Sequence, residues 1–198
     1  HNGIDTSKFR PLKNDFRQVY GLENKFILLG VSSVWNDLKG YSDFIKLSSM
    51  LSDEYRIVLV GLNKQQIEAL PENIIGIEKT NSIKELAYIY SSADLFLNLT
   101  YCDNYPTVNL EARACGLPVV TYNTGGSPES AGMIPELTAP QSDLKTVLEE
   151  IEKFRGSPEV FQYKYSKEKY DKKFAVADYI CEYLMDKNNL DGVVLDPP

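Results

Sequence analysis

Two acidic residues eight positions apart are the side chains whose types and spacing are best suited to chemistry. Asp103 lies in a predicted loop, and Glu111 lies within the helix that follows. The positive end of that helix, with its free N–H groups, favours an anionic ligand. The Glu111 carboxylate is suited to accept hydrogen bonds from vicinal hydroxyls such as those of a ribose. The alternative is that Asp103 caps the helix and Glu111 is only solvated.

A lysine at the start of another predicted helix is the third candidate. Lys39 stands where the helix dipole disfavours positive charge, and a bound diphosphate would neutralise it. The alternative is a solvated surface lysine. In the same loop, the backbone N–H groups of Ser32 and Ser33 are further candidates for phosphate binding, and Trp35 either shields the site or packs on the surface.

The stretch that contains both acids carries a family resemblance. Residues 103–129 read DNYPTVNLEARACGLPVVTYNTGGSPE. The acid-x7-Glu spacing and the Gly-Gly-x-Pro-Glu turn resemble GT-B glycosyltransferases of the family 4 type, found among bacterial capsule and exopolysaccharide enzymes. The resemblance implies that Asp103 contacts the donor sugar, that Glu111 holds the nucleotide ribose and that Lys39, in a Lys-Gly pair, contacts the donor phosphates.

This sequence departs from the family pattern at two positions. Many relatives have glutamate where Asp103 stands, and the shorter aspartate has less reach toward sugar hydroxyls. Many also have an arginine where Ser33 stands, and a hydroxyl donates one hydrogen bond where a guanidinium offers a charged fork. The second departure puts the strength of the phosphate contact in doubt.

The resemblance also implies the surroundings of the donor. Asn81 and Ser82 follow the third predicted strand, where the family reads the base mainly through backbone groups, so uracil and guanine are not distinguished. Tyr101 and Tyr105 either wall the pocket or pack. The other residues expected to face the donor sugar are Asn104, Pro106 and Thr107. No cofactor or metal is expected, because lysine and helix N-termini stabilise a leaving diphosphate in this type of enzyme.

Short apolar runs alternate with helical patterns along most of the chain. Six runs are predicted as strands, at residues 26–31, 57–61, 74–77, 94–98, 118–122 and, more weakly, 133–137. This alternation predicts an α/β fold with a doubly wound parallel sheet, Rossmann-like, as one half of a GT-B glycosyltransferase. The candidate loops all leave from the carboxyl ends of strands, where such sheets bind ligands.

Local signals set the expected helix ends. Pro106 is expected in the first helical turn, because its missing N–H needs no partner there. Gly116 is expected to adopt the left-handed conformation after the same helix. Ser82 is expected to cap a helix with Glu85 in the reciprocal position. The glycines at 125–126 are expected to permit a tight turn into another helix.

Composition limits the function classes. The chain has 198 residues, of which 43% are hydrophobic, as in one large globular domain. Its net charge of −7 argues against a nucleic-acid partner. The three cysteines have neither metal-ligand spacing nor an even count, which favours a reducing compartment. No apolar run reaches membrane-spanning length.

Four segments are expected. Residues 1–20 read as an interdomain connector, residues 21–156 as the donor-binding domain and residues 157–186 as C-terminal helices that pack on it or on a missing N-terminal domain. Residues 187–198 read as a loose tail. His1 is assigned no role.

The expected function is transfer, with retention, of a sugar from a UDP- or GDP-linked donor to a glycan or lipid-linked acceptor. The acceptor would be held by the missing N-terminal domain, so this domain alone would be inactive. The expected location is the cytoplasm, and the resemblance leaves peripheral association with the inner face of the cell membrane open. One alternative is a non-catalytic nucleotide-sugar-binding subunit that pairs with a separate acceptor-binding chain. Another is a sugar-nucleotide epimerase or a glycan phosphorylase.

Overall fold

A single parallel sheet forms the centre of the protein. The computed structural model describes residues 3–134 and 137–157. The strand order is β3-β2-β1-β4-β5-β6, and every neighbouring pair is parallel. The strands are β1 (Phe26–Val31), β2 (Tyr55–Val60), β3 (Ile74–Ile77), β4 (Leu95–Asn98), β5 (Val119–Tyr122) and β6 (Thr138–Ala139). The predicted α/β fold with a parallel sheet is therefore confirmed.

The central strands are mainly apolar because both of their faces are covered. In β1, Ile27 and Leu29 point into one buried cluster and Leu28 points into the other. All three side chains are at most 1% exposed. Such continuous apolar runs are typical of parallel strands with helices on both sides.

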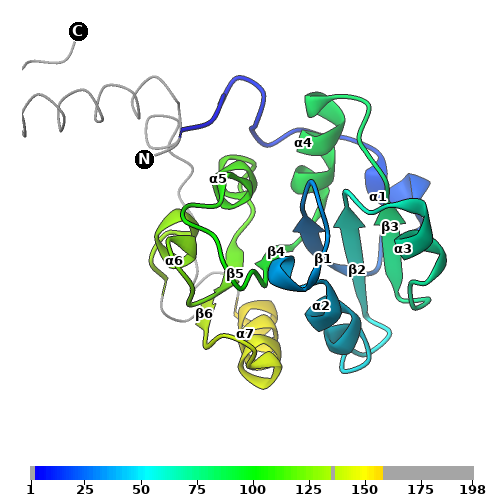
Figure 1. Cartoon of the computed structure of the whole chain (residues 1–198). Helices are drawn as coiled ribbons and strands as arrows, with labels where there is room; N and C mark the ends of the chain where they lie inside the picture. The colour runs from blue at the N-terminus through cyan, green and yellow to red at the C-terminus, as the bar shows by residue number, and fades with distance from the viewer. Residues whose placement is uncertain (1–2, 135–136, 158–198) are drawn as a thin grey trace, which may run out of the picture.

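Helices cover both faces of the sheet (Figure 1). One face packs on α1 (Phe16–Val19), α4 (Ile83–Ser92) and α5 (Thr107–Ala114). The other face packs on α2 (Tyr41–Ser48), α3 (Lys64–Glu68) and α7 (Leu144–Gly156). The short 3-10 helix η1 (Asp37–Lys39) precedes α2, and α6 (Ser127–Ala131) lies between β5 and β6.

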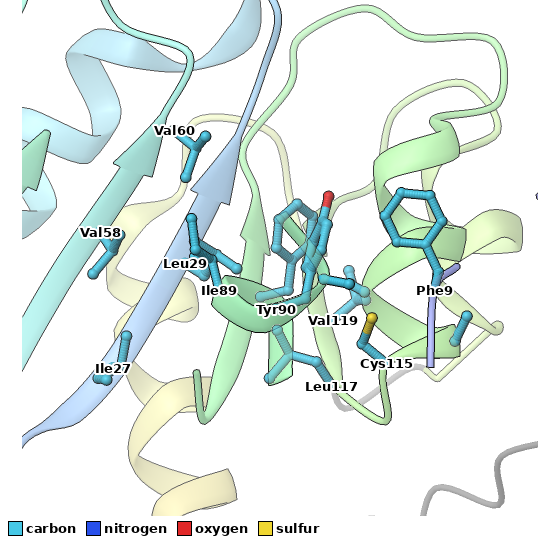
Figure 2. Close-up of a cluster of buried hydrophobic side chains, with 14 of the residues drawn as sticks. Phe9, Ile27, Leu29, Val58, Val60, Ile89, Tyr90, Cys115, Leu117 and Val119 are labelled. Atoms are coloured by element: carbon cyan, nitrogen blue, oxygen red, sulfur yellow. The ribbon is translucent and has the colours of Figure 1, made fainter. Parts of the chain in front are cut away.

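Tyr90 of α4 lies inside the first cluster, between the strands and Phe9 (Figure 2). Its ring meets Phe9 edge-on at a centroid distance of 6.1 Å and lies 5.6 Å from the ring of Phe96. The side chain is fully buried. A buried tyrosine needs a partner for its hydroxyl, and this partner belongs to the candidate site described below.

Two details of the sequence-based prediction are wrong. The last strand is β6 at Thr138–Ala139 rather than at residues 133–137, because Gly132 and Met133 both adopt positive φ (107° and 56°) and the chain must turn there before it pairs. Pro106 is the N-cap of α5, with extended backbone, and not a residue of its first turn.

Other predicted helix ends agree with the structure. Gly116 has φ 82°, as expected for the residue after α5. The Ser82 hydroxyl caps α4 as predicted, since it accepts a hydrogen bond from the Glu85 N–H; the Glu85 carboxylate, however, accepts from the N–H of Asn81, the residue before the cap, and the predicted reciprocal bond to Ser82 is replaced by this one. In the described part of the chain, no helix has the length and apolar character needed to cross a membrane. His1 and the predicted segments after residue 157 lie outside the described residues.

Candidate functional site

A cavity of about 230 Å³ opens at the carboxyl edge of the sheet, between the ends of β1 and β4. These two strands are neighbours at the point where the strand order reverses, because β2 and β3 lie on one side of β1 and β4 to β6 on the other. Open α/β sheets bind ligands at this switch point. The cavity is smaller than the roughly 300–1,000 Å³ of a complete small-molecule site, so it suits one part of a larger ligand.

Two predicted site residues meet directly in this cavity. The Lys39 ammonium donates a hydrogen bond to Asp103 Oδ2 at 2.7 Å, and the two side chains are 36% and 23% exposed. The other carboxylate oxygen of Asp103 accepts from the N–H of Tyr105 at 3.2 Å. Asp103 therefore orders its own loop and does not cap α5, whose N-cap makes no side-chain hydrogen bond.

The backbone of the Lys39 segment is fastened to the loop after β4. The carbonyl of Leu38 accepts from the N–H of Tyr101 at 2.8 Å and from the hydroxyl of Thr100 at 3.1 Å. Gly40 follows Lys39 with φ 75°, and a Cβ at this position would lie 2.2 Å from the carbonyl oxygen of Leu99. Glycine is required here because the two backbones touch.

The two glycines after β5 serve a second close contact. A Cβ on Gly125 would lie 2.1 Å from the carbonyl oxygen of Asp103, and one on Gly126 would lie 2.0 Å from that of Asn104. The N–H of Gly126 also donates to the Asp103 carbonyl at 3.3 Å. These glycines permit a turn, as predicted, and they also let the Asp103 loop rest on that turn.

A buried polar chain fixes α5 beneath the cavity. Asn98 at the end of β4 donates to Asn109 of α5 at 2.9 Å, and Asn109 is fully buried. The Asn109 amide in turn donates to the Ser130 hydroxyl at 2.9 Å and to the carbonyl of Ser127 at 3.2 Å. Since buried amides are costly without partners, this chain holds β4, α5 and α6 in one relative position.

Glu111 lies one helical turn beyond Thr107 and contacts Tyr90 instead of the cavity. Thr107 and Val108 line the cavity, and residues three and four positions further on share that side of a helix. The Tyr90 hydroxyl donates to Glu111 Oε2 at 2.9 Å. Burial raises the pKa of Glu111 to about 7, although the hydrogen bond from Tyr90 acts in the opposite direction.

The structure brings together most of the predicted site residues. Besides Lys39 and Asp103, the cavity is lined by the predicted residues Ser32, Ser33, Tyr105, Pro106 and Thr107. Trp35 also lines it but is largely a packing residue, because it is 7% exposed, meets Phe44 edge-on at 5.3 Å and donates from its indole to the carbonyl of Val60.

Four predicted site residues lie outside the cavity lining: Glu111, Asn81, Ser82 and Asn104. Asn81 and Ser82 are exposed at the start of α4, where they take part in its cap. Asn104 is exposed, and its carbonyl faces Gly126. Their predicted contacts with the base and the sugar stay predictions.

Sequence reasoning missed Asn98 as a lining residue and Asn109 as its support. A signal for Asn98 was present, since it is a polar residue that ends an otherwise apolar strand at the ligand-binding edge. The remaining missed lining residues are apolar: Val31, Phe44, Leu97, Leu99 and Val108.

A larger hollow, of about 750 Å³, lies at the opposite edge of the sheet along residues 11–18. Two of the polar side chains that line it, Arg17 and Asn14, already have partners. The Arg17 guanidinium binds Asp94, and Asn14 accepts from Ser92. The smaller cavity is therefore the better candidate. Within residues 3–134 and 137–157, no three His, Cys, Asp or Glu side chains are grouped to hold a metal ion.

Comparisons with known proteins identify the family of the chain. Residues 25–155 match the family described as glycosyl transferases group 1. The chain is 26% identical over 141 residues to a D-inositol 3-phosphate glycosyltransferase of Mycobacterium sp. (strain KMS), covering 65% of this chain and 32% of the relative. It is 31% identical over 137 residues to the alpha-galactosylglucosyldiacylglycerol synthase of Streptococcus pneumoniae, covering 60% of this chain and 36% of the relative. The chain thus spans about a third of the length of these relatives.

Solved structures share the fold. Anabaena HepE, in complex with UDP and glucose, superposes with a TM-score of 0.76 at 18% identity over 93% of this chain and 55% of that one. The C-terminal domain of a group 1 glycosyl transferase (LpcC) from Francisella tularensis superposes with a TM-score of 0.65 at 16% identity over 89% of this chain and 98% of that one. The sheet and its helices therefore have the Rossmann-like architecture of GT-B glycosyltransferase structures.

Proposed function

Because this chain belongs to the group 1 family of glycosyl transferases, we propose that it is the donor-binding, C-terminal half of a retaining glycosyltransferase. The donor is a sugar linked to UDP or GDP. The acceptor is a glycan or a lipid-linked sugar of the capsule or exopolysaccharide class, held by an N-terminal domain on the same or another chain. UDP and UDP-glucose in the HepE structures support this type of donor.

The observation that carries the proposal is the meeting of Lys39, Asp103 and the start of α5 around one cavity at the switch point of the sheet. The ammonium and the first N–H groups of α5 are donors for an anionic group. The volume of about 230 Å³ suits a diphosphate with part of its sugar. The side of α5 that carries Glu111 lies outside this cavity, and we assign it to binding of the ribose.

The proposed chemistry is electrostatic. Negative charge builds on the departing phosphate as the bond to the anomeric carbon breaks, and fixed positive groups at that position lower the barrier. Lys39 and the N–H groups of Thr107 and Val108 would supply this stabilisation. Asp103 would release Lys39, and its carboxylate would then accept hydrogen bonds from sugar hydroxyls. These steps require no metal ion.

The location in the cell follows from the same proposal. Nucleotide sugars are consumed in the cytoplasm by enzymes of this proposed class, so we place the protein there, with the full enzyme peripheral on the inner face of the membrane when its acceptor is lipid-linked. The second candidate function is a nucleotide-sugar-binding subunit without activity of its own.

Calorimetric titration of the chain with UDP, GDP and ADP tests the proposal. We expect one of them to bind, and we expect Lys39→Ala and Glu111→Ala each to weaken that binding. No measurable binding of any of the three would refute a nucleotide site. Transfer of sugar by a longer protein that contains this chain, followed by mass spectrometry of a lipid-linked acceptor, separates the enzyme from the binding subunit.

A further inference from the structure

A buried carboxylate outside the cavity connects the segments that form it. Asp43 lies in α2, its side chain is 4% exposed, and it does not line the cavity. Its Oδ2 atom accepts hydrogen bonds from the hydroxyls of Tyr101 at 2.6 Å and Tyr122 at 2.8 Å. Its Oδ1 atom accepts from the ammonium of Lys46 at 3.3 Å.

The two tyrosines precede different parts of the candidate site. Tyr101 precedes Asp103 by two residues in the loop after β4. Tyr122 ends β5, just before the glycine turn on which Asp103 rests. Asp43 itself lies four residues after Lys39. One buried carboxylate therefore joins the Lys39 segment, the Asp103 loop and the glycine turn.

The hydrogen bonds that Tyr101 and Tyr122 donate to Asp43 are short. Hydrogen bonds to an ionised group are shorter and about twice as strong as neutral ones. The rings of Tyr101 and Tyr122 also meet edge-on at a centroid distance of 5.6 Å. Burial, and then the neighbouring Asp43, raise the pKa of both hydroxyls, so both remain protonated donors.

The same loop carries the bond that aligns Lys39. The N–H of Tyr101 donates to the carbonyl of Leu38, the residue before Lys39. A displacement of the Tyr101 ring would therefore disturb the hydrogen bond to Leu38 and the position of Asp103 together. Because binding groups must be held within about 0.5 Å of the productive geometry, small displacements here matter for a ligand.

We propose that Asp43 is a positioning residue, which acts through Tyr101 and Tyr122 to fix the separation of Lys39 and Asp103 and thereby the affinity for the donor diphosphate. The identity of the ligand in this inference rests on the proposed function. The fixing of the loops by Asp43 does not depend on it.

The test compares Asp43→Asn and Tyr101→Phe with the control Asp94→Asn. Asp94 is a hydrogen-bonded carboxylate at the opposite edge of the sheet, 31% exposed, where its Oδ2 accepts from Arg17 and from the N–H of Ile27, each at 2.7 Å. We expect Asp43→Asn and Tyr101→Phe to weaken UDP binding about tenfold. We expect the control to change it by no more than about twofold, as distant sites are nearly independent.

A double-mutant cycle with Lys39→Ala separates positioning from general destabilisation. If Asp43 acts through Lys39, Asp43→Asn weakens nucleotide binding by only about twofold or less when Lys39 is already absent. A full tenfold loss in that background, or an equal loss in Asp94→Asn, overturns the proposal.

Hydrogen exchange gives a readout that needs no ligand. We expect faster exchange of the Tyr101 and Gly126 amides in Tyr101→Phe and in Asp43→Asn, and no change at these amides in Asp94→Asn. Unchanged exchange in both site variants overturns the positioning role, even if the wild type binds nucleotide. If the wild type binds no nucleotide while exchange responds as expected, the proposed function fails and the positioning role stands.

Discussion

The ion pair between Lys39 and Asp103 leads to a prediction in which two substitutions have opposite effects. In the structure the ammonium is 2.7 Å from Asp103 Oδ2, so a diphosphate must share Lys39 or displace the carboxylate. Removing the lysine and removing the charge of its present partner should therefore change UDP affinity in opposite directions.

The magnitudes follow from the exposure of the pair. With side chains 36% and 23% exposed, the pair is screened by solvent, and its net contribution is about 0.5–1 kcal/mol. A hydrogen bond from an ammonium to a phosphate is worth about 1.5–3 kcal/mol. Lys39→Ala should therefore weaken UDP binding roughly 10- to 100-fold. Asp103→Asn should tighten it about two- to fivefold, because the asparagine no longer competes for the ammonium.

Asparagine is the right replacement because it retains the acceptor for the Tyr105 N–H. The assay is calorimetric titration with UDP at about 50 mM and about 200 mM salt, since screening should reduce both effects. Asp37→Asn is the matched control. It removes the same charge from the Lys39 segment, at a residue whose carboxylate accepts from Ser42.

One result would refute the reasoning: Asp103→Asn weakening UDP binding as strongly as Lys39→Ala does. The two residues would then act together on the diphosphate rather than compete. An improvement in Asp37→Asn equal to that in Asp103→Asn would also refute it, because the effect would be one of net charge. A UDP-sugar adds a check, since its advantage over UDP should shrink in Asp103→Asn if Asp103 contacts the sugar.

Three further predictions concern burial and close packing. UDP affinity should rise between pH 6 and 8 as Glu111, whose pKa burial raises to about 7, ionises and can accept from the ribose; Glu111→Gln should remove this change in titrations. Burial raises the pKa of Glu150 from 4.5 to about 8, so the stability that its protonated form contributes is fully present below about pH 4.5 and is lost as the pH rises through 8. Glu150→Gln should therefore raise the free energy of unfolding at pH 9 by roughly 1–3 kcal/mol in urea melts. The same substitution at the exposed Glu149 should leave the free energy of unfolding unchanged. Gly126→Ala should weaken UDP binding about tenfold, because its Cβ would lie 2.0 Å from a carbonyl oxygen of the facing loop, whereas Gly156→Ala, with nothing within 4 Å, should leave binding unchanged.

The sequence predicted best those elements whose residues suit only one environment, such as a strand that is buried on both faces. The run Phe26–Val31 is apolar at nearly every position, and the structure has a strand with those bounds. The strand β6 was misplaced because it has only two residues, too few for a pattern, and its start depends on how the chain turns at Met133. A positive φ at a methionine leaves no signal in composition.

The candidate site divides in the same way. The convergence of Lys39 and Asp103 followed from the rule that parallel strands end at one edge, although their direct contact was not predicted. Asp43 was not predicted at all, since an acidic residue between the apolar positions of α2 looks like part of a solvated face. Its partners Tyr101 and Tyr122 are 58 and 79 residues away in sequence, and no local pattern reports such contacts.

The fastening of Leu38 to Thr100 and Tyr101 has a kinetic consequence. The segment before Lys39 is bonded through its backbone to the loop after β4, and Gly40 touches Leu99, so this segment is held in place before a ligand enters. If the proposed function holds, we expect nucleotide to bind in a single step whose observed rate rises in proportion to nucleotide concentration, without a plateau.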